Sequence, residues 1–353
     1  MMNEEQKLQS LAEPLVSWYR ENARKLPWRE GKNPYHIWLS EIMLQQTRVE
    51  AVKGYYARFL DKLPTVSALA EVGEEELMKL WQGLGYYNRA RNLKRAAEVI
   101  VSEYDGRFPD TYEVLLQLPG IGEYTAGAIA SIAFDRRVPA VDGNVYRIYS
   151  RIFAYEKDIM ASASRKEIRE KIEKIVPAKE PGAFNQAWMD LGATVCIPNG
   201  EPHCDICPLN SFCSSYQNHT QSDYPVKKKK KPRKIEERTV FLLEYQGKYL
   251  IQKRPPKGLL AGLWEFPSQE GKMSVTEVTK QLDSLEMDHD SLELLGTGKH
   301  IFSHVEWHMI GYLIHLKELT DHFSDTMVLA DKGELEKKYS IPSAFAVYLN
   351  QIL

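Results

Sequence analysis

Two carboxylates stand in sequence surroundings that suit acid–base chemistry. Glu41 lies in the stretch HIWLSEIMLQQT, within a predicted helix that is apolar nearly all round, and a helix of that kind is buried. A buried carboxyl group without a partner keeps its proton because burial raises its pKa, and a general acid near neutral pH needs this property. A glutamate paired with a buried arginine, or one at a helix edge, fits the same residues, so the sequence leaves these alternatives open.

Asp142, in the stretch AVDGNVYRIYSR, is the second acid and lies 101 positions further along the chain. It precedes a predicted helix, and its simplest role is the N-cap of that helix. An ionised carboxylate could instead stabilise a developing sugar cation, as in the cleavage of glycosidic bonds. Only a fold can bring Asp142 and Glu41 together.

A tight turn with the sequence LPGIG precedes a predicted helix from Tyr124 to about Phe134. Its glycines, Gly120 and Gly122, tolerate positive φ and let another backbone come close. The start of the helix offers free amides and the positive end of the helix dipole. This pattern indicates a site for an anion such as a nucleic-acid phosphate, with an ordinary helix–helix turn as the alternative.

The cysteines form one cluster in the sequence, with seven, two and five residues between neighbours: Cys196, Cys204, Cys207 and Cys213. An intracellular chain rarely uses cysteines for stable disulfides, so the cluster indicates a metal site. Four thiolates can bind zinc or hold a [4Fe-4S] cluster. The spacing does not by itself separate zinc from a [4Fe-4S] cluster. Zinc sites more often contain two separated C-x-x-C pairs, and this chain has one pair, so we favour the [4Fe-4S] cluster in a structural role.

The composition is that of a globular protein with more than one domain. The chain has 353 residues, 43% hydrophobic and 27% charged, no apolar run long enough for a membrane helix, and an acidic start that argues against a secretory signal. Residues 235–353 carry 12 basic and 18 acidic side chains, a net charge of −6, so residues 1–234 carry +4. A basic first part that ends in Lys227–Lys231 fits an anionic polymer or simply a solvated surface.

The pattern of apolar residues divides the chain into a helical part and an α+β part. Residues 6–225 show helical periodicity, and Asn33-Pro34 is typical of an N-cap followed by proline at the first helical position. Residues 218–236 are polar and lysine-rich, which predicts an exposed linker. Short β-like runs at 239–243 and 249–251 flank a Gln246-Gly247 turn, so residues 237–353 are predicted to form an α+β domain.

Taken together, these motifs resemble the helix-hairpin-helix DNA glycosylases related to endonuclease III and, within that superfamily, the adenine DNA glycosylases of the MutY family. The resemblance extends along the whole chain. It rests on the following stretches: LPWR (26–29), WLSEIMLQQTRVE (38–50), GLGYYNRARNL (83–93), LPGIGEYTAGAI (118–129), VDGNVYRI (141–148), FNQAWMDLGATVC (184–196), the cysteine loop and GLLAGLWEFP (258–267).

The resemblance implies roles for the two acids and their neighbours. Glu41 protonates adenine at N7 and handles the incoming water, and Asp142 stabilises the oxocarbenium-like sugar or attacks it transiently. Asn144 orients these groups. Bifunctional relatives carry a lysine where this chain has Tyr124, and a phenol cannot form their Schiff base, so the resemblance implies a monofunctional enzyme in which Tyr124 assists by hydrogen bonding.

The resemblance also implies a set of substrate contacts. The adenine leaves the base stack to reach the acids, and Gln46 and Tyr86 fill or wedge the duplex where it opens. The hairpin glycines, Gly120 and Gly122, bind the DNA backbone. The residues implied to line the adenine pocket are Arg24, Leu26, Trp28, Arg29 and Gln186.

The C-terminal part resembles a Nudix fold without the acidic Nudix box, so pyrophosphate hydrolysis is not expected. In the family this domain reads 8-oxoguanine opposite the adenine through a Phe-Ser-His loop, which corresponds to Phe302, Ser303 and His304. The implied substrate is therefore duplex DNA with adenine opposite 8-oxoguanine or guanine. One feature departs from the family pattern, because the first two cysteines are one residue further apart than expected, in a loop that contains Glu201 and His203.

The resulting prediction is a multidomain protein with an all-α helix-hairpin-helix glycosylase core, an iron–sulfur cluster loop and an α+β Nudix-like domain. The predicted parts are a cluster domain (1–29 and 137–225), a six-helix domain (30–136), a linker (226–236) and an 8-oxoguanine-recognition domain (237–353). We expect a monomer in the bacterial cytoplasm, at the nucleoid. A bifunctional glycosylase/lyase acting on oxidised pyrimidines, and a non-catalytic DNA-binding or redox-sensing protein, are the rival functions.

Overall fold

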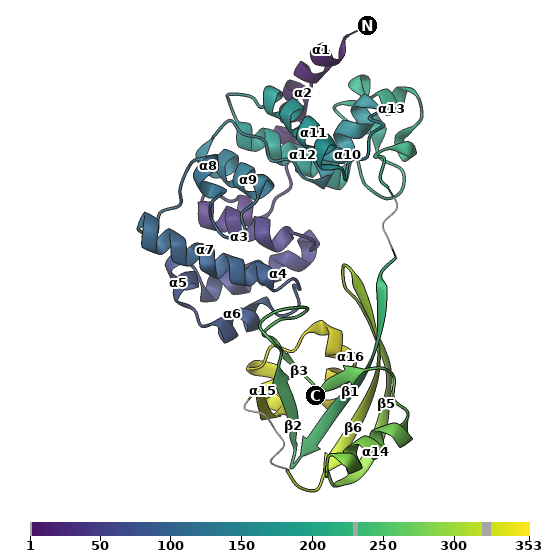
Figure 1. Ribbon diagram of the computed structural model, residues 1–353. Coiled ribbons are helices and arrows are strands. Elements are labelled where there is room, and N and C mark those ends of the chain that lie inside the picture. Colours follow the sequence, from purple (N-terminus) through teal and green to yellow (C-terminus); the bar gives the residue numbers. More distant parts are fainter. Residues whose placement is uncertain (1, 229–231, 320–325) are drawn as a thin grey trace. The chain divides into compact units, whose positions relative to one another are not determined.

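The computed structural model describes residues 2–228, 232–319 and 326–353 (Figure 1). The chain divides into two compact units. The first contains Met1–Glu71 and Asn92–Lys230, and the second contains Val72–Arg91 and Lys231–Leu353. The lysine run Lys227–Lys231 lies partly outside the described residues. Among those residues, none of the helices combines the length and the hydropathy that a bilayer-spanning segment requires.

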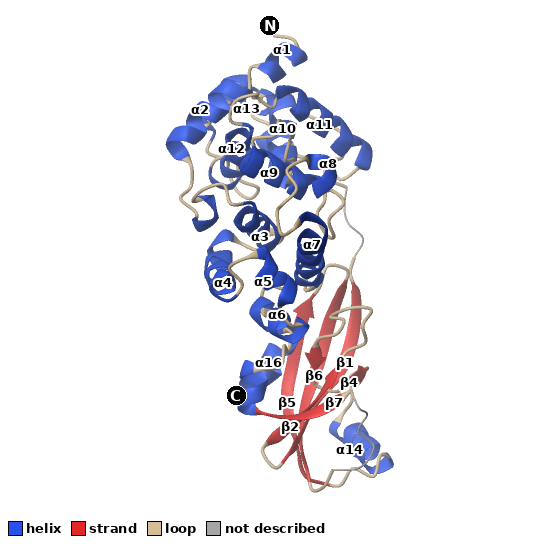
Figure 2. Ribbon diagram, turned by 90° about the vertical axis from the view of Figure 1, so that its left-hand side faces the viewer, coloured by secondary structure: helices blue, strands red, loops and turns tan. Residues whose placement is uncertain are grey.

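The described part of the first unit is helical, and every strand in the described residues belongs to the second unit (Figure 2). This agrees with the predicted all-α core. The helices of the first unit are α1 (Glu4–Gln9), α2 (Ala12–Asn22), α3 (Pro34–Leu44), α4 (Val49–Lys62), α5 (Val66–Glu71), most of α7 (Asn88–Tyr104), α8 (Tyr112–Leu115), α9 (Glu123–Phe134), α10 (Gly143–Phe153), α11 (Ser162–Ile175), α12 (Pro181–Thr194) and α13 (Ser214–Gln217). Short 3-10 turns are η1 (Pro27–Arg29), η2 (Cys204–Ile206), η3 (Asn210–Phe212) and η4 (Gln221–Asp223).

Helix α3 is buried nearly all round, as its apolar sequence predicts. The Asn33 side chain caps it by accepting hydrogen bonds from the amides of Tyr35 and His36, and Pro34 occupies the first turn. The buried residues are Tyr35, Ile37, Trp38, Leu39, Ser40, Glu41, Ile42 and Met43. The helix therefore carries one acid into an apolar environment.

A glycine of α9 and an asparagine of α12 allow these two helices to pack closely against the segment that leads into α10. A Cβ at Gly127 of α9 would collide with the carbonyl oxygen of Pro139, so glycine allows the segment before α10 to lie against α9. Asn185 of α12 fixes that segment: its Oδ1 accepts the amide of Ala140 (2.9 Å), and its Nδ2 donates to Ser131 Oγ (2.8 Å). These contacts set where α10 begins, and thereby where Asp142 lies.

The predicted hairpin turn is present just before α9. Gly120 has a φ of 76°, and a Cβ there would lie 2.5 Å from Cβ of Asn92. Gly122 is extended, with a φ of −96°, and is the N-cap of α9. Only the first glycine therefore needs the left-handed region, and the helix begins at Glu123, one residue earlier than predicted.

The second unit contains one mixed sheet with helices on both faces. Its core strand order is β3-β2-β1-β6-β5, with β1 parallel to β6 and the other pairs antiparallel; β4 pairs with β1, and β7 with β2. The strands are β1 (Lys234–Tyr245), β2 (Lys248–Lys253), β3 (Trp264–Glu265), β4 (Ser268–Glu270), β5 (His289–Ile301), β6 (Val305–Leu316) and β7 (Met327–Asp331). The helices are α6 (Glu74–Trp81), the first residues of α7, α14 (Val275–Ser284), α15 (Lys332–Lys337) and α16 (Ala346–Ile352), with the turn η5 (Ser343–Phe345).

The two faces of the sheet bury separate hydrophobic clusters. Helix α14 covers one face through Val278 and Leu282, and α15 and α16 cover the other through Leu335 and Tyr348 (Figure 1). The turn between β1 and β2 has positive φ at both central residues, Gln246 and Gly247, as a two-residue type I′ hairpin requires. The predicted α+β fold is confirmed, and β1 begins at residue 234, inside the segment predicted to be linker.

Candidate active site

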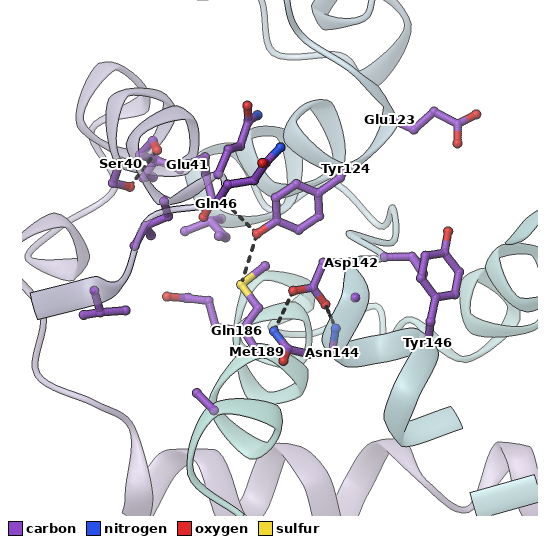
Figure 3. A pocket seen from close by; sticks show the side chains of 18 of the residues that line it. Ser40, Glu41, Gln46, Glu123, Tyr124, Asp142, Asn144, Tyr146, Gln186 and Met189 are labelled. Atoms are coloured by element: carbon purple, nitrogen blue, oxygen red, sulfur yellow. Dashed lines mark hydrogen bonds between the residues drawn. The ribbon is translucent and has the colours of Figure 1, made fainter. Parts of the chain in front are cut away.

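One pocket of about 1260 Å³ in the first unit takes in both predicted acids (Figure 3). Glu41 comes from α3, Tyr124 from α9, and Asp142 from the residue before α10. The structure thus brings together side chains that are far apart in the sequence. The predicted residues that line this pocket are Arg24, Leu26, Trp28, Arg29, Glu41, Gln46, Tyr124, Asp142, Asn144 and Gln186.

Glu41 keeps its proton to a higher pH than an ordinary glutamate does. Its side chain is buried, and the Tyr124 hydroxyl donates to its Oε2 at 2.6 Å. Burial raises the pKa of Glu41 to about 7; the nearby Asp142 acts in the same direction, while the Tyr124 hydrogen bond and the charge of Arg29 oppose it. Near pH 7 a large fraction of the molecules therefore carries a transferable proton at the pocket wall.

Tyr124 is a hydrogen-bond donor that stays protonated. Burial, together with the neighbouring carboxyl groups of Glu41 and Asp142, holds the pKa of Tyr124 well above its usual range. The hydroxyl also lies 3.6 Å from Sδ of Met189, on the side of the pocket formed by α12 (Figure 3). The phenol therefore orients the Glu41 carboxyl group through a hydrogen bond and brings no charge of its own.

Asp142 is the N-cap of α10, as predicted, and it also lines the pocket. Its Oδ1 accepts the amides of Asn144 (2.8 Å) and Val145 (3.0 Å), and its Oδ2 accepts Nδ2 of Asn144 (2.6 Å). Burial raises the pKa of Asp142, and these hydrogen bonds together with the charge of Arg147 oppose the rise. Donors aimed at the carboxylate stabilise its ionised form.

Arg147 fixes the orientation of Asn144, and the sequence analysis did not single it out. Its Nη2 donates to Oδ1 of Asn144 and to the carbonyl oxygen of Gly192, both at 2.8 Å, and its Nε donates to the carbonyl oxygen of Cys196 at 2.9 Å. Because Asn144 Oδ1 accepts from Arg147, its amide nitrogen faces Asp142. The spacing of three residues along α10 was the only sequence signal for this pair.

Two arginines of the predicted adenine pocket bind a residue that the sequence analysis missed. Arg24 and Arg29 both form ion pairs with Asp190 of α12, which is fully buried. Among the residues that the structure describes, no arginine forms an ion pair with Glu41, although the charge of Arg29 acts on it. Trp28 packs edge-on against Tyr56, with ring centroids 5.4 Å apart, and is buried.

The residues predicted to contact DNA lie in both units. Gln46 lines the pocket with a φ of 59°, a backbone conformation that is strained for a residue with a side chain. The hairpin glycines lie in the turn before α9, outside the pocket lining. In the second unit, Tyr86 has a φ of 49° and is half exposed, and its hydroxyl lies 3.1 Å from Oγ of Ser303.

The Phe-Ser-His stretch forms the tip of the hairpin between β5 and β6. The amide of Phe302 donates to the carbonyl oxygen of Val305 at 2.9 Å, which closes the turn. The Phe302 ring packs edge-on against Trp307 with a centroid distance of 4.9 Å, whereas Ser303 and His304 are exposed. The hairpin therefore presents the two polar side chains outward from an anchored aromatic base.

The four cysteines line one small cavity in the first unit together with apolar residues such as Ile148 and Leu209. Arg151 donates from Nη1 to Cys196 Sγ at 3.2 Å, and Gln221 Nε2 lies 3.7 Å from Cys204 Sγ. Burial raises the pKa of Cys207 to about 12, so a thiolate there needs a bound cation, which a metal centre supplies. Within the described residues, no group of three histidine, cysteine or acidic side chains lies close enough for a single metal ion.

The raised pKa of Glu41 predicts that its replacement changes stability in a pH-dependent way. The unfolded chain ionises this group near its ordinary pKa of 4.5, and the folded protein near 7. The folded state therefore binds more protons between these values, so its stability falls as the pH rises through this window. At pH 8, Glu41→Gln removes this cost of about 3 kcal/mol, taking about 1.4 kcal/mol per pKa unit.

Urea unfolding of the wild type and of Glu41→Gln at pH 4.5 and pH 8 measures this difference. The free energy of unfolding of the variant, relative to the wild type, should increase between the two pH values. The same change at the exposed Glu13 is the control and should show no comparable increase. An equal pH dependence in the wild type and the Glu41 variant would contradict the buried, protonated state.

Comparison with known proteins supports the assignment of both halves. Residues 39–178 match the HhH-GPD superfamily base excision DNA repair proteins, and residues 239–351 match the NUDIX domain. A solved structure of a thermostable thymine-DNA glycosylase superimposes with a TM-score of 0.55 and 31% identity, over 60% of this chain and 97% of that chain. The predicted helix-hairpin-helix core and Nudix-like domain are confirmed.

Two adenine DNA glycosylases align with most of the chain. The adenine DNA glycosylase of Buchnera aphidicola (subsp. Schizaphis graminum) is 36% identical over 308 residues, which cover 86% of each chain. The adenine DNA glycosylase of Rattus norvegicus is 37% identical over 351 residues, which cover 83% of this chain and 68% of the rat protein. Since both matches run through the helical core and into the sheet domain, the chain belongs to the adenine DNA glycosylase family of base excision repair enzymes.

Proposed function

We propose that this protein is a monofunctional DNA glycosylase that hydrolyses the N-glycosidic bond of adenine mispaired with 8-oxoguanine, or with guanine, in duplex DNA. The observation that carries the proposal is the Tyr124–Glu41 hydrogen bond in the pocket that Asp142 also lines. A protonated acid and a carboxylate held by amide donors are the two groups that glycoside cleavage requires. The protein acts as a monomer on DNA, at the nucleoid of the bacterial cytoplasm.

The proposed reaction begins with proton transfer from Glu41. The adenine is flipped out of the duplex into the pocket, and the Glu41 carboxyl group donates its proton to N7. The bond between N9 and C1′ then breaks, and the bonding electrons leave with the base. Tyr124 holds the Glu41 oxygen through its hydrogen bond during this step.

Asp142 takes the second role in this proposal. Its carboxylate faces the oxocarbenium-like sugar and stabilises the positive charge on C1′ and the ring oxygen, while Asn144 keeps it oriented. Water then adds to C1′ and gives a proton to the ionised Glu41, which restores the acid. The products are free adenine and an abasic site.

The remaining pocket residues supply recognition in this proposal. Leu26 and Trp28 provide an apolar wall for the purine, and Arg24, Arg29 and Gln186 provide hydrogen-bond donors for its edge. Gln46 and Tyr86 occupy the space left in the duplex, and the hairpin glycines with the start of α9 bind a backbone phosphate. The division into cluster domain (1–29 and 137–225), six-helix domain (30–136), linker (226–236) and recognition domain (237–353) is part of the same proposal.

Replacing either acid should stop the chemistry and leave binding intact. Glu41→Gln cannot donate the proton, and Asp142→Asn cannot stabilise the sugar cation, so each should lower the single-turnover rate of adenine release by about 10²–10⁴-fold. Release of free adenine from an adenine:8-oxoguanine duplex measures the rate, and gel retardation measures duplex affinity.

Glu50→Gln, at an exposed position of α4, is the control and should keep the wild-type rate. Near wild-type release by either acid variant would refute the assignment of the acids. Borohydride treatment of the wild-type reaction should trap no lysine-linked DNA, and a stable adduct would favour the rival glycosylase/lyase.

Recognition of the partner base is assigned to the hairpin tip at Phe302, Ser303 and His304. The exposed hydroxyl of Ser303 is suited to hydrogen bonding with the oxidised base, and the acidic recognition domain suits a few specific contacts better than broad phosphate binding. Ser303→Ala should reduce the preference for 8-oxoguanine over guanine by about tenfold, because one base contact is worth about 1–3 kcal/mol.

The measurement compares adenine release from duplexes with adenine opposite 8-oxoguanine and opposite guanine. Phe302→Leu, which alters the base of the tip, should reduce the same preference. Ser284→Ala, on α14 of the same unit, should leave it unchanged. A preference unaltered by Ser303→Ala would detach this hairpin from recognition.

We also propose that Cys196, Cys204, Cys207 and Cys213 hold a [4Fe-4S] cluster in a structural role. The convergence of all four on one apolar cavity supports this, as do Arg151 and Gln221, which donate toward the sulfur atoms. Purified wild-type protein should contain about four iron atoms and four inorganic sulfides per chain. Cys207→Ser should lose most of both and unfold at a lower temperature, whereas one zinc per chain without iron would overturn the proposal.

A further inference from the structure

We propose that Asp190 is a positioning residue of this site: it fixes Arg24 and Arg29 in the pocket wall and keeps Arg29 from pairing with Glu41. The inference rests on the proposed function, because it concerns the proton that Glu41 delivers. Asp190 itself does not line the pocket, whereas both arginines do. It therefore acts through them.

Arg24 and Arg29 together donate four hydrogen bonds to the carboxylate of Asp190. Its Oδ1 accepts Nε of Arg24 (2.6 Å) and Nη2 of Arg29 (2.8 Å), and its Oδ2 accepts the amide of Arg24 (3.0 Å) and Nη1 of Arg29 (2.7 Å). Four N–H donors use the four lone-pair positions of a carboxylate. The two-point contact with Arg29 fixes the plane of the guanidinium as well as its position.

Because Asp190 is buried, loss of its ion pairs with Arg24 and Arg29 is energetically unfavourable. Asp190 has no exposed side-chain surface, whereas the side chains of Arg24 and Arg29 are 26% and 13% exposed. Burial alone would raise the pKa of Asp190, but the hydrogen bonds and charges of Arg29 and Arg24 hold it below its usual range. Asp190 is thus an ionised group whose removal leaves two arginines without their shared anion.

The segment that Asp190 holds has little regular structure of its own. Between α2 and α3, residues 23–33 contain only the short turn η1. Nη1 of Arg29 also donates to the carbonyl oxygen of Arg24 at 3.2 Å, which closes the segment on itself. Helix α12 presents Gln186 to the pocket one turn before Asp190, so one helix positions two parts of the pocket wall.

Asp190 determines which carboxyl group forms an ion pair with Arg29. The charged or titratable groups that act on Glu41 are Tyr124 from α9, Asp142 at the start of α10, and Arg29 from η1. Arg29 is the cation among them, and the groups that act on it are the carboxyl groups of Asp190 and Glu41 and the Tyr19 phenol. Without the charge of Asp190, Glu41 becomes the remaining acid partner, and an ion pair there would hold Glu41 ionised.

The test is the pH dependence of adenine release under single-turnover conditions for the wild type and Asp190→Asn. The rate falls as Glu41 loses its proton, so the alkaline limb reports its pKa. In Asp190→Asn this limb should move to lower pH by about one unit, the scale on which a neighbouring opposite charge lowers a carboxyl pKa. The maximal rate should fall at least tenfold.

Two further variants separate the role of the charge from a general loss of structure. In Asp190→Asn/Arg29→Met, the limb should return to the wild-type position or higher because the released cation is gone. Arg24→Met, which removes the other partner and keeps the Asp190–Arg29 pair, should retain the wild-type limb at a reduced rate. A purely structural role of Asp190 would change rates and leave all limbs in one place.

Asp190→Glu keeps the charge and tests the proposal where Asp190→Asn does not fold. Its limb should stay at the wild-type pH with a lowered rate, and a limb moved to lower pH would overturn the proposal. A wild-type limb in folded Asp190→Asn, or a shift that persists in the double variant, would overturn it too. Wild-type protein that releases no adenine would refute the proposed function instead.

Discussion

The site depends on the free-energy cost of burying one ionised carboxyl group in an apolar helix. Glu41 is the acid of α3, and the other buried residues of this helix are mainly apolar. Transfer of an ionised carboxylate into such surroundings is very unfavourable, so the group keeps its proton and its pKa rises to about 7. A phenol is a suitable partner, because Tyr124 donates a hydrogen bond without bringing a charge. A lysine in the same place would stabilise the ionised form and end the role of Glu41 as an acid.

Asp142 is partly buried, and its carboxylate accepts more hydrogen bonds than that of Glu41. Two backbone amides at the start of α10 and the Asn144 side chain donate to it, and the helix N-terminus adds a partial positive charge. These donors offset part of the desolvation that raises its pKa. One pocket therefore contains a buried acid that accepts one hydrogen bond from a phenol and an acid that accepts three hydrogen bonds. In the proposed function, this difference in environment suits Glu41 to proton donation and Asp142 to charge stabilisation.

The sequence predicted these two acids because their local surroundings carry the signal. The apolar run around Glu41 indicates burial, the residues after Asp142 indicate a helix start, and Asn33-Pro34 predicts the cap of α3, all of which the structure contains. Asp190 also lies in an apolar stretch, which indicates burial, but nothing near it in the sequence identifies its partners. It is one acid in an otherwise apolar stretch of α12, and its partners lie 161 and 166 positions earlier. A carboxylate whose meaning depends on distant arginines cannot be interpreted before the helices are packed.

The same reasoning explains why polar contacts, more than apolar packing, specify this site. Apolar side chains tolerate small shifts of one helix against another, whereas a buried hydrogen-bonded group loses its partner when the register changes. Asn185 fixes α12 to the segment before Asp142, Asp190 fixes α12 to the segment before α3, and Arg147 fixes α10 to the end of α12. All three ties involve one helix. Helix α12 therefore sets the distance between the wall that would bind the base and the carboxylate that would face the sugar, although it supplies neither of the two acids.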